Sequence, residues 1–299
     1  REDGRMIWKA FAAATLLLGT AAAGTAQDVS PQPPSPGSAV VAADTPAAGA
    51  APSAGAATTA APAIASVPFG VGERLEYQVK LGPVGVGNGS MEILELADVR
   101  GWPTYHIQFR VEGGIPFARV NNRLESWLDV GQLVSRRFEQ DQHEVRFRRH
   151  RIFEIFPEER RWEIVDSDDE GPLASELPLD DVSFLYFVRT IPLEVGQTYT
   201  YNRYFRESGN PVVLHVLRKE TVRVPAGTFE TVVVQPIIQT SGLFGDGGRA
   251  EVYFTDDDRR LLVQMKSSVP VIGSLSLHLT SYRAGRPATP ADLPGNAAE

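Results

Sequence analysis

The stretch Asp180–Leu193, DDVSFLYFVRTIPL, constrains the fold most strongly, because it is the only part of the chain after Val67 that is typical of a helix. Asp180 and Asp181 offer carboxylates that can cap a first turn, and Pro192 predicts the end of the helix. The side chains between these limits are apolar nearly all round, so we expect the helix to be buried on most sides. A curved antiparallel sheet is the natural cover for such a helix.

The rest of this region alternates between polar and apolar residues with the period of two that is typical of strands with one exposed face. Glu73–Leu81 is an example, because its apolar and polar side chains occupy opposite registers. We therefore predict an all-β, mainly antiparallel fold. It is a single curved sheet or half-open β-barrel of about a dozen strands wrapped around one buried apolar helix.

One segment, Val145–Pro157, departs from simple alternation. Alternate residues of a strand share one face, and here that face carries Phe147, then the basic Arg149 and Arg151, and then apolar residues again. We expect a β-bulge near Arg149-His150, which would restore an apolar inner face to this strand.

Composition divides the chain into four segments. Residues 1–26 resemble a secretory signal peptide, since one Lys precedes an apolar run that ends in small residues, with residues 1–5 as an upstream extension. Cleavage after Ala26 is expected, and an uncleaved membrane anchor is the alternative. Residues 27–66 are rich in Ala and Pro and are expected to be a disordered linker. A β-barrel-like domain over 67–283 and a disordered tail over 284–299 follow.

Charge and cysteine content limit the possible partners. A net charge of -8 lacks the basic footprint that binding to phosphate backbones requires, so nucleic acid is not an expected partner. A chain with no cysteine has no thiol nucleophile, no Cys-ligated zinc, no disulfide and no lipidated Cys of a bacterial lipoprotein. We expect no integral membrane span once the signal peptide is cleaved.

Five motifs occur in order along the domain. They are PFGVGERLEY at Pro68–Tyr77, RLESWLD at Arg123–Asp129, DVSFLYFVR at Asp181–Arg189, VPAGTFET at Val224–Thr231, and the strand pair around Phe254–Arg260. Together, over about Val67 to Tyr282, they resemble the bacterial envelope family catalogued as domain of unknown function 3108. The resemblance implies an exported protein of an outer-membrane-bearing bacterium and supplies no reaction and no catalytic residues. More loosely, a curved antiparallel sheet around a helix is similar to the lipoprotein-carrier folds of the periplasm.

No motif points to catalysis, a metal or a cofactor. The five histidines have no short metal-binding spacing, and no G-x-S-x-G sequence occurs. The acidic runs Asp256–Asp258 and Asp166–Glu170 are typical of a turn and a solvated loop, because calcium needs more oxygen ligands spaced around the ion. Asp180 and Asp181 are interpreted as a helix cap and not as a catalytic pair. We expect the protein not to be an enzyme. A hydrolase is kept only as a remote alternative to the two non-enzymatic functions given below.

The aromatic residues of the predicted helix are candidates for a binding site. Phe184, Tyr186 and Phe187 could form the wall of a cavity as readily as they could fill the core. Leu243 and Phe244, at the tip of a glycine-rich hairpin loop, are candidates for a lid over that cavity.

A group of arginines is the second candidate site. Arg146, Arg148, Arg149 and Arg151 lie close together in a protein that is otherwise acidic. Such a surface could bind anionic lipid head groups or a phosphorylated glycolipid. The alternative is a solvated hairpin whose arginines pair with local acids.

These features predict a periplasmic envelope protein that acts as a binding module for a lipid or other apolar envelope molecule. The alternative is a structural or interaction protein of the envelope with a solid core. The volume enclosed beside the helix separates the two hypotheses, because a ligand needs an apolar cavity of several hundred cubic ångströms.

Overall fold

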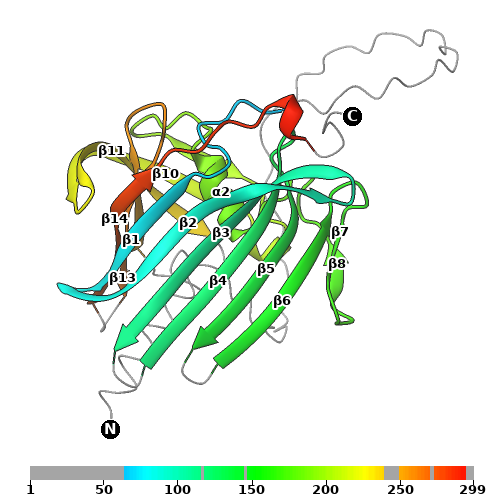
Figure 1. The fold of residues 1–299 in the computed structure, drawn as a ribbon, viewed down its shortest axis with the longest axis horizontal. Coiled ribbons are helices and arrows are strands. Elements are labelled where there is room, and N and C mark those ends of the chain that lie inside the picture. Colours follow the sequence, from blue (N-terminus) through cyan, green and yellow to red (C-terminus); the bar gives the residue numbers. More distant parts are fainter. Residues whose placement is uncertain (1–63, 116–117, 145–146, 239–248, 270–272, 294–299) are drawn as a thin grey trace, which may run out of the picture. The chain divides into compact units, whose positions relative to one another are not determined.

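The computed structural model describes residues 64–115, 118–144, 147–238, 249–269 and 273–293 (Figure 1). The strands are β1 (Arg74–Leu81), β2 (Val84–Val99), β3 (Trp102–Ile115), β4 (Ala118–Asp129), β5 (Ser135–Glu144), β6 (Phe147–Phe156), β7 (Arg161–Ile164), β8 (Glu170–Pro172), β9 (Thr198–Tyr201), β10 (Val212–Val224), β11 (Gly227–Ile238), β12 (Arg249–Thr255), β13 (Leu262–Val269) and β14 (Gly273–Arg283). The helices are α2 (Asp181–Val188) and the short 3₁₀ turns η2 (Glu207–Gly209) and η3 (Pro290–Asp292).

All 14 strands belong to one antiparallel sheet, with the order β8-β7-β6-β5-β4-β3-β2-β1-β14-β13-β12-β11-β10-β9. The first and last strands of the chain pair in the middle of this sheet, and β8 and β9 are its two edges. The sheet is therefore not closed within the described residues. The prediction of an antiparallel all-β fold is confirmed, and the strand number exceeds about a dozen partly because β8 forms within the acidic loop before the helix.

The alternation of residues in β1 decides which face of the sheet is buried. Leu75, Tyr77 and Val79 are at most 4% exposed, whereas the polar side chains between them face outward. The Tyr77 hydroxyl, which is also buried, donates a hydrogen bond to the carbonyl of Leu262 at 2.9 Å. At β1 the inner face is therefore apolar and its buried hydroxyl is hydrogen-bonded, which allows this part of the sheet to pack against the interior.

Helix α2 has eight residues, fewer than the stretch Asp180–Leu193 predicted. Asp180 is its N-cap, as expected, but the helix ends at Val188 with Arg189 as the C-cap. The Thr190 hydroxyl donates to the carbonyl of Phe187 at 2.8 Å and satisfies one of the last free acceptors. Pro192 also disfavours helical geometry at the residue before it, so its effect begins earlier than predicted.

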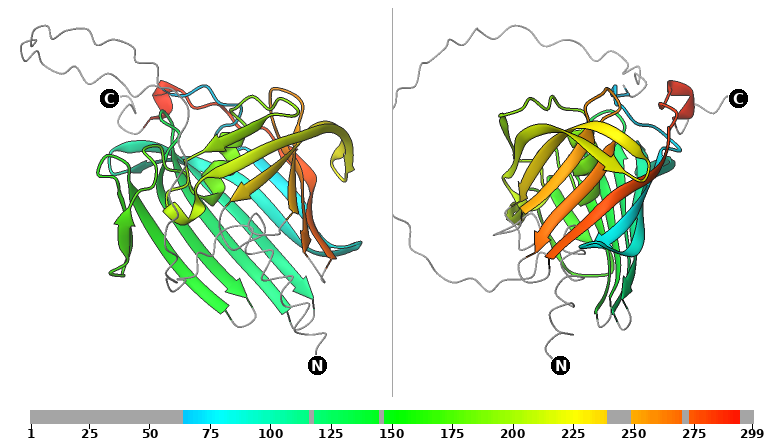
Figure 2. Two further views of the ribbon diagram at one scale, coloured as in Figure 1. Left: turned by 180° about the vertical axis from the view of Figure 1, so that it is seen from behind. Right: turned by 90° about the vertical axis from the view of Figure 1, so that its left-hand side faces the viewer.

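Every side chain of α2 from Val182 to Val188 is buried. The helix contacts β3 and β4, and Figure 2 shows it between these strands and the half of the sheet that contains β10–β13. Apolar side chains from both halves of the sheet therefore surround the helix.

A buried ion pair holds the C-terminal end of α2. Arg189 and Glu73, 4% and 1% exposed, form two hydrogen bonds of 2.6 and 2.9 Å between the guanidinium and the carboxylate. The guanidinium also donates to the carbonyl of Arg259 at 3.1 Å and lies 5.2 Å from the centre of the Phe69 ring. Because Glu73 directly precedes β1, this pair joins the helix to the middle of the sheet.

Residues that precede β1 and residues that follow β14 also pack against the domain. The amide of Ala65 donates to the carbonyl of Val130 at 2.8 Å, and Val71 forms an isolated bridge with Arg286. Leu293 is 3% exposed. Residues 284–293, which composition assigns to a disordered tail, thus contact the domain. In the portions of the chain that the structure describes, no helix has the length and apolar character needed to cross a membrane.

The Arg189–Glu73 pair predicts a large loss of stability when one partner is removed. Glu73→Gln leaves the guanidinium buried without a counter-charge, so we expect the free energy of unfolding to fall by about 3–5 kcal/mol. The double variant Glu73→Leu/Arg189→Met should recover most of this loss. Urea unfolding followed by tryptophan fluorescence measures both effects.

Glu112→Gln is the matched control, because Glu112 pairs with Arg110 at 2.9 Å on the surface, where the two side chains are 52% and 46% exposed. An exposed pair contributes less than about 1 kcal/mol. If Glu73→Gln costs no more than Glu112→Gln, the buried pair does not hold the helix.

Candidate apolar binding pocket

Asp180 fixes the N-terminal end of α2 to the sheet. Its Oδ1 accepts the amides of Val182 and Ser183 at 2.8 and 2.9 Å, and Ser183 completes a capping box. Its Oδ2 accepts the hydroxyls of Ser126 on β4 and Ser135 on β5 at 2.6 and 2.7 Å. The carboxylate is fully buried, and burial raises its pKa although these four donors oppose the shift.

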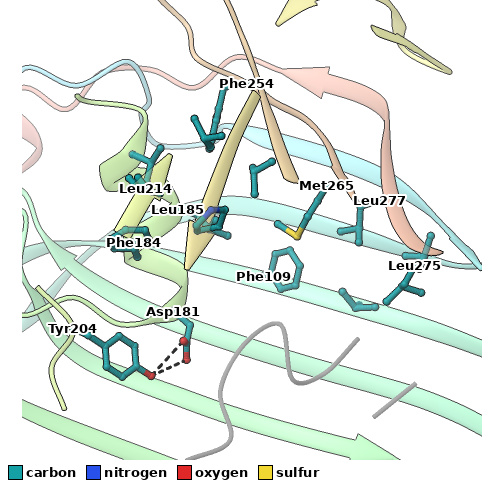
Figure 3. Close-up of a pocket in the computed structure, with 16 residues that line it drawn as sticks. Phe109, Asp181, Phe184, Leu185, Tyr204, Leu214, Phe254, Met265, Leu275 and Leu277 are labelled. Carbon is teal, nitrogen blue, oxygen red and sulfur yellow. Dashed lines mark hydrogen bonds between the residues drawn. The ribbon is translucent and has the colours of Figure 1, made fainter. Parts of the chain in front are cut away.

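Asp181 does not share this role. It lies in the first turn, where its carboxylate faces a cavity and accepts the Tyr204 hydroxyl at 3.3 and 3.4 Å (Figure 3). Burial, and then the neighbouring Asp180, raise the pKa of Asp181 to about 7. The sequence predicted that both aspartates cap the helix. In the structure only Asp180 is the cap, and Asp181 lines the pocket.

The cavity beside α2 is lined by apolar side chains from both halves of the sheet, and its volume is about 40 Å³. Figure 3 shows the helix residues on one side and the β12–β14 residues on the other. The lining residues are Val79, Phe109, Val111, Asp181, Phe184, Leu185, Val188, Tyr204, Leu214, Val234, Pro236, Val252, Phe254, Met265, Leu275 and Leu277. Among these, only Asp181 and Tyr204 carry polar groups, so the pocket is apolar with one polar end.

One face of α2 supplies the helical part of the lining. Asp181, Phe184, Leu185 and Val188 are spaced by three, four and seven residues from the first, which places them on one side of a helix. Of the predicted cavity residues, Phe184 lies in this wall. Leu185 and Val188 were missed, although the helical period starting at Asp181 would have indicated them.

The other two predicted aromatic residues do not line the pocket. Tyr186 packs edge-on against Phe69, with ring centres 5.0 Å apart. Phe187 packs against Tyr201 on β9, with ring centres 5.2 Å apart. Both therefore join the helix to its surroundings and do not face the cavity.

The predicted lid residues Leu243 and Phe244 lie outside the described residues, as does Arg146. Their proposed roles stay predictions.

The remaining predicted arginines, all on β6, do not share one surface. Arg148 is exposed on the outer face, whereas Arg149 and Arg151 are partly buried on the inner face with Phe153. The pairing of β5 with β6 runs without a register shift from Glu144–Phe147 to Arg137–Glu154. The expected bulge at Arg149-His150 is therefore wrong, because the unbroken register of the strand carries the two arginines inward.

The described residues contain no group of three or more His, Asp or Glu side chains that could hold a metal ion.

Comparison with known proteins now defines the family. The family model described as "Protein of unknown function (DUF3108)" matches residues 76–280. The chain belongs to this family. The family resemblance predicted from the five sequence motifs is thus confirmed, and a search of curated proteins finds no match.

Three solved structures with low sequence identity resemble this DUF3108 protein. One is a beta-barrel-like protein of DUF1849 from Brucella abortus, with 10% identity, a TM-score of 0.46, and coverage of 75% of this chain and all of the other. A candidate lipoprotein from Parabacteroides distasonis has 9% identity and a TM-score of 0.32, with 73% and 98% covered. A candidate exported protein with a YmcC-like fold from Bacteroides fragilis has 10% identity and a TM-score of 0.28, with 74% and 100% covered.

The Asp180 network predicts that this side chain is essential for stability. Asp180→Ala removes the helix cap and leaves two buried serine hydroxyls without their acceptor, so we expect a loss of about 2–4 kcal/mol in the free energy of unfolding. Asp180→Asn keeps one oxygen acceptor and should cost less. Urea unfolding measures both, with Asp168→Ala in an exposed loop as the control. Equal, small effects of all three substitutions would contradict the proposed role.

The Asp181 carboxyl predicts a pH-dependent stability difference. Its pKa is about 7 in the folded protein and lower in the unfolded chain, so the folded state binds this proton more tightly. The associated stabilisation is complete below about pH 4 and is lost as the pH rises through 7. Asp181→Asn cannot titrate, so it should match the parent near pH 4 and exceed its stability by about 4 kcal/mol at pH 8.

Thermal unfolding from pH 4 to pH 8 measures this difference, because groups that do not interact with Asp181 contribute equally in parent and variant. A difference that does not change with pH would show that Asp181 is ionised throughout this range.

Proposed function

We propose that this protein is a binding module for a lipid or other apolar envelope molecule, which it holds between α2 and the inner face of the sheet. The observation that carries this proposal is the composition of the pocket wall. Of the 16 residues that line it, 14 have no polar side-chain group, and the two polar ones, Asp181 and Tyr204, contact each other at one end. Apolar pockets with a few placed polar groups are typical of small-molecule sites.

The volume of the pocket requires that it expand when a ligand binds. A cavity of about 40 Å³ exceeds the roughly 10–15 Å³ that one water molecule needs, but it is far below the roughly 300 Å³ of common ligand sites. Met265, which is unbranched, and Leu185, which branches only at Cγ, lie in the wall and have flexible side chains. Rotation of such side chains can enlarge an apolar pocket without breaking a hydrogen bond.

The same small volume favours a second function, that of a structural or interaction protein of the envelope with a solid core. In that case the pocket is a packing defect. The inner face then serves only to hold α2, through the hydrogen bonds of Asp180 and the Arg189–Glu73 ion pair. The two functions differ in whether a ligand occupies the space beside the helix.

We also propose that the protein is not an enzyme and acts in the periplasm. This proposal is supported by the sequence, which has no cysteine, no G-x-S-x-G motif and no short metal-binding spacing of histidines. Location in the periplasm is supported by the signal-peptide pattern at residues 1–26.

Binding of dansyl undecanoic acid, a fluorescent fatty-acid analogue, tests the proposed function. We expect saturable fluorescence enhancement by the folded protein, and a co-purifying lipid in native mass spectrometry after gentle purification. Val252→Phe places a larger side chain in the pocket wall and should weaken binding by about tenfold or more.

Val222→Phe is the matched control, because Val222 is 6% exposed on β10 and does not line the pocket. It should cost similar stability and leave binding unchanged. If the parent protein neither retains a lipid nor binds the probe, the solid-core function replaces this proposal.

A further inference from the structure

Two rows of paired residues lead from the apolar pocket across the inner face of the sheet. The first begins at Val111, which lines the pocket on β3. Val111 pairs with Asn122 on β4, Asn122 with Gln142 on β5, and Gln142 with Arg149 on β6. Neighbouring strands are about 4.8 Å apart, so the row covers about 15 Å. Along it the side chains change from apolar to amide to guanidinium.

The second row repeats the same change two residues further along each strand. It starts at Phe109 in the pocket wall, passes through Leu124 on β4 and Gln140 on β5, and ends at Arg151 on β6. Leu124 and Gln140 are both 2% exposed, so this row is part of the interior. The inner surface therefore has an apolar end at β3 and a basic end at β6.

A third arginine, Arg206, lies near the basic end but belongs to no strand. Arg206, which precedes η2, has its guanidinium 5.3 Å from the centre of the Phe153 ring on β6 and 6.0 Å from that of Tyr204. Since Tyr204 lines the pocket, Arg206 connects the pocket to the arginines of β6. Arg149 and Arg151 lie on the same face of β6 as Phe153, and Arg206 lies over the Phe153 ring, so the three arginines gather at this end of the sheet. In agreement with this geometry, burial and then the charges of Arg151 and Arg206 lower the pKa of Arg149.

Two side chains in this region have buried polar atoms without a hydrogen-bond partner. Gln142 is fully buried, and neither its amide oxygen nor its amide nitrogen has a hydrogen-bond partner. The Nε of Arg206 is also buried without a partner. Buried polar groups in native proteins are nearly always satisfied, and an unsatisfied group costs about 1–3 kcal/mol. The Gln142 amide and the Arg206 Nε are therefore free to bond to a polar group of a ligand.

The nearby acids do not balance the charge of the three arginines. Asp181 interacts with Arg206, but its pKa of about 7 leaves it only partly ionised at neutral pH. Glu144 interacts with Arg149. Within the described part of the interior, the basic end therefore carries net positive charge.

We propose that the ligand is a single-chain anionic lipid, with its acyl chain in the apolar pocket and its negatively charged head group against Arg149, Arg151 and Arg206. This inference rests on the proposed function, because it specifies the ligand class of the same pocket. Guanidinium groups form charge-assisted hydrogen bonds with carboxylates and phosphates, and Gln142 can donate to or accept from the head group. A head group held there also explains why two arginines occupy the inner face of an otherwise apolar sheet.

Competition against dansyl undecanoic acid with lipids of one chain length and different head groups tests the charge requirement. Palmitic acid carries a carboxylate, and palmitoyl lysophosphatidic acid a phosphate. Palmitamide is neutral, and hexadecyltrimethylammonium is a cation. We expect the two anions to compete at least about tenfold more strongly than the other two lipids. The stronger of the two anions identifies the preferred head group.

Variants on β6 test the residues. Arg149→Gln/Arg151→Gln should raise the Kd of the anionic lipids by about tenfold or more and leave that of palmitamide unchanged. Arg149→Lys/Arg151→Lys keeps both charges and should retain most of the preference for anions, which separates charge from folding. Arg148→Gln, on the exposed face of the same strand, is the matched control and should have no effect.

Equal binding of anionic and neutral lipids, unaffected by the β6 variants, would overturn the anionic-lipid inference and leave the apolar binding function intact. Absence of binding by all four lipids and by the probe would overturn both. Loss of binding in Arg148→Gln as well as in the inner-face variants would assign the effect to the outer surface and overturn the head-group site.

Discussion

The buried ion pair between Arg189 and Glu73 is the constraint on which the interior of this protein depends. Removing both charges from water is costly. The two terminal nitrogens of the guanidinium each meet a carboxylate oxygen, and the group also contacts a backbone carbonyl and an aromatic ring, which offsets this cost. The pair fixes one end of α2 to the segment before β1. Asp180 fixes the other end to serines on β4 and β5. A helix of only two turns is thus held at both ends by buried polar groups.

Fixing both ends also fixes the rotation of the helix about its axis. Tyr186 is directed at Phe69, and the face that begins at Asp181 is directed at the cavity. The apolar pocket exists because this face of the helix and the strands β1, β3 and β10–β14 do not fill all the space between them. The polar groups of α2 therefore fix the geometry of an apolar pocket, and β6 supplies partly buried arginines to the same inner face of the sheet.

Much of the fold could be predicted from local pattern. Alternation in segments such as Glu73–Leu81 indicates strands, and Asp180 before an apolar run indicates a helix start, since both depend on nearest neighbours in the chain. The Arg189–Glu73 pair could not be predicted, because its members are 116 residues apart and neither carries a local signal.

The arginines of β6 show how a correct pattern can be misinterpreted. The sequence placed Arg149 and Arg151 in the register of Phe153, and a bulge was expected because charged residues are rarely found on an inner face. The register is regular, so the interior itself is partly basic. An interruption in the apolar face of a strand looks like a defect when that strand is considered alone. In the structure it coincides with polar side chains that β5 and Arg206 place beside it.

By itself the sequence determined the antiparallel all-β class, the family and the helix start, because these depend on periodicity, capping and motifs that are local in the chain. Only the tertiary structure decided which helix residues face the pocket, that Asp180 and Asp181 have different roles, and that the arginines of β6 point inward. The physical reason is that these features depend on the rotation of α2 and on pairing across β3, β4, β5 and β6, which bring together residues that are distant in sequence.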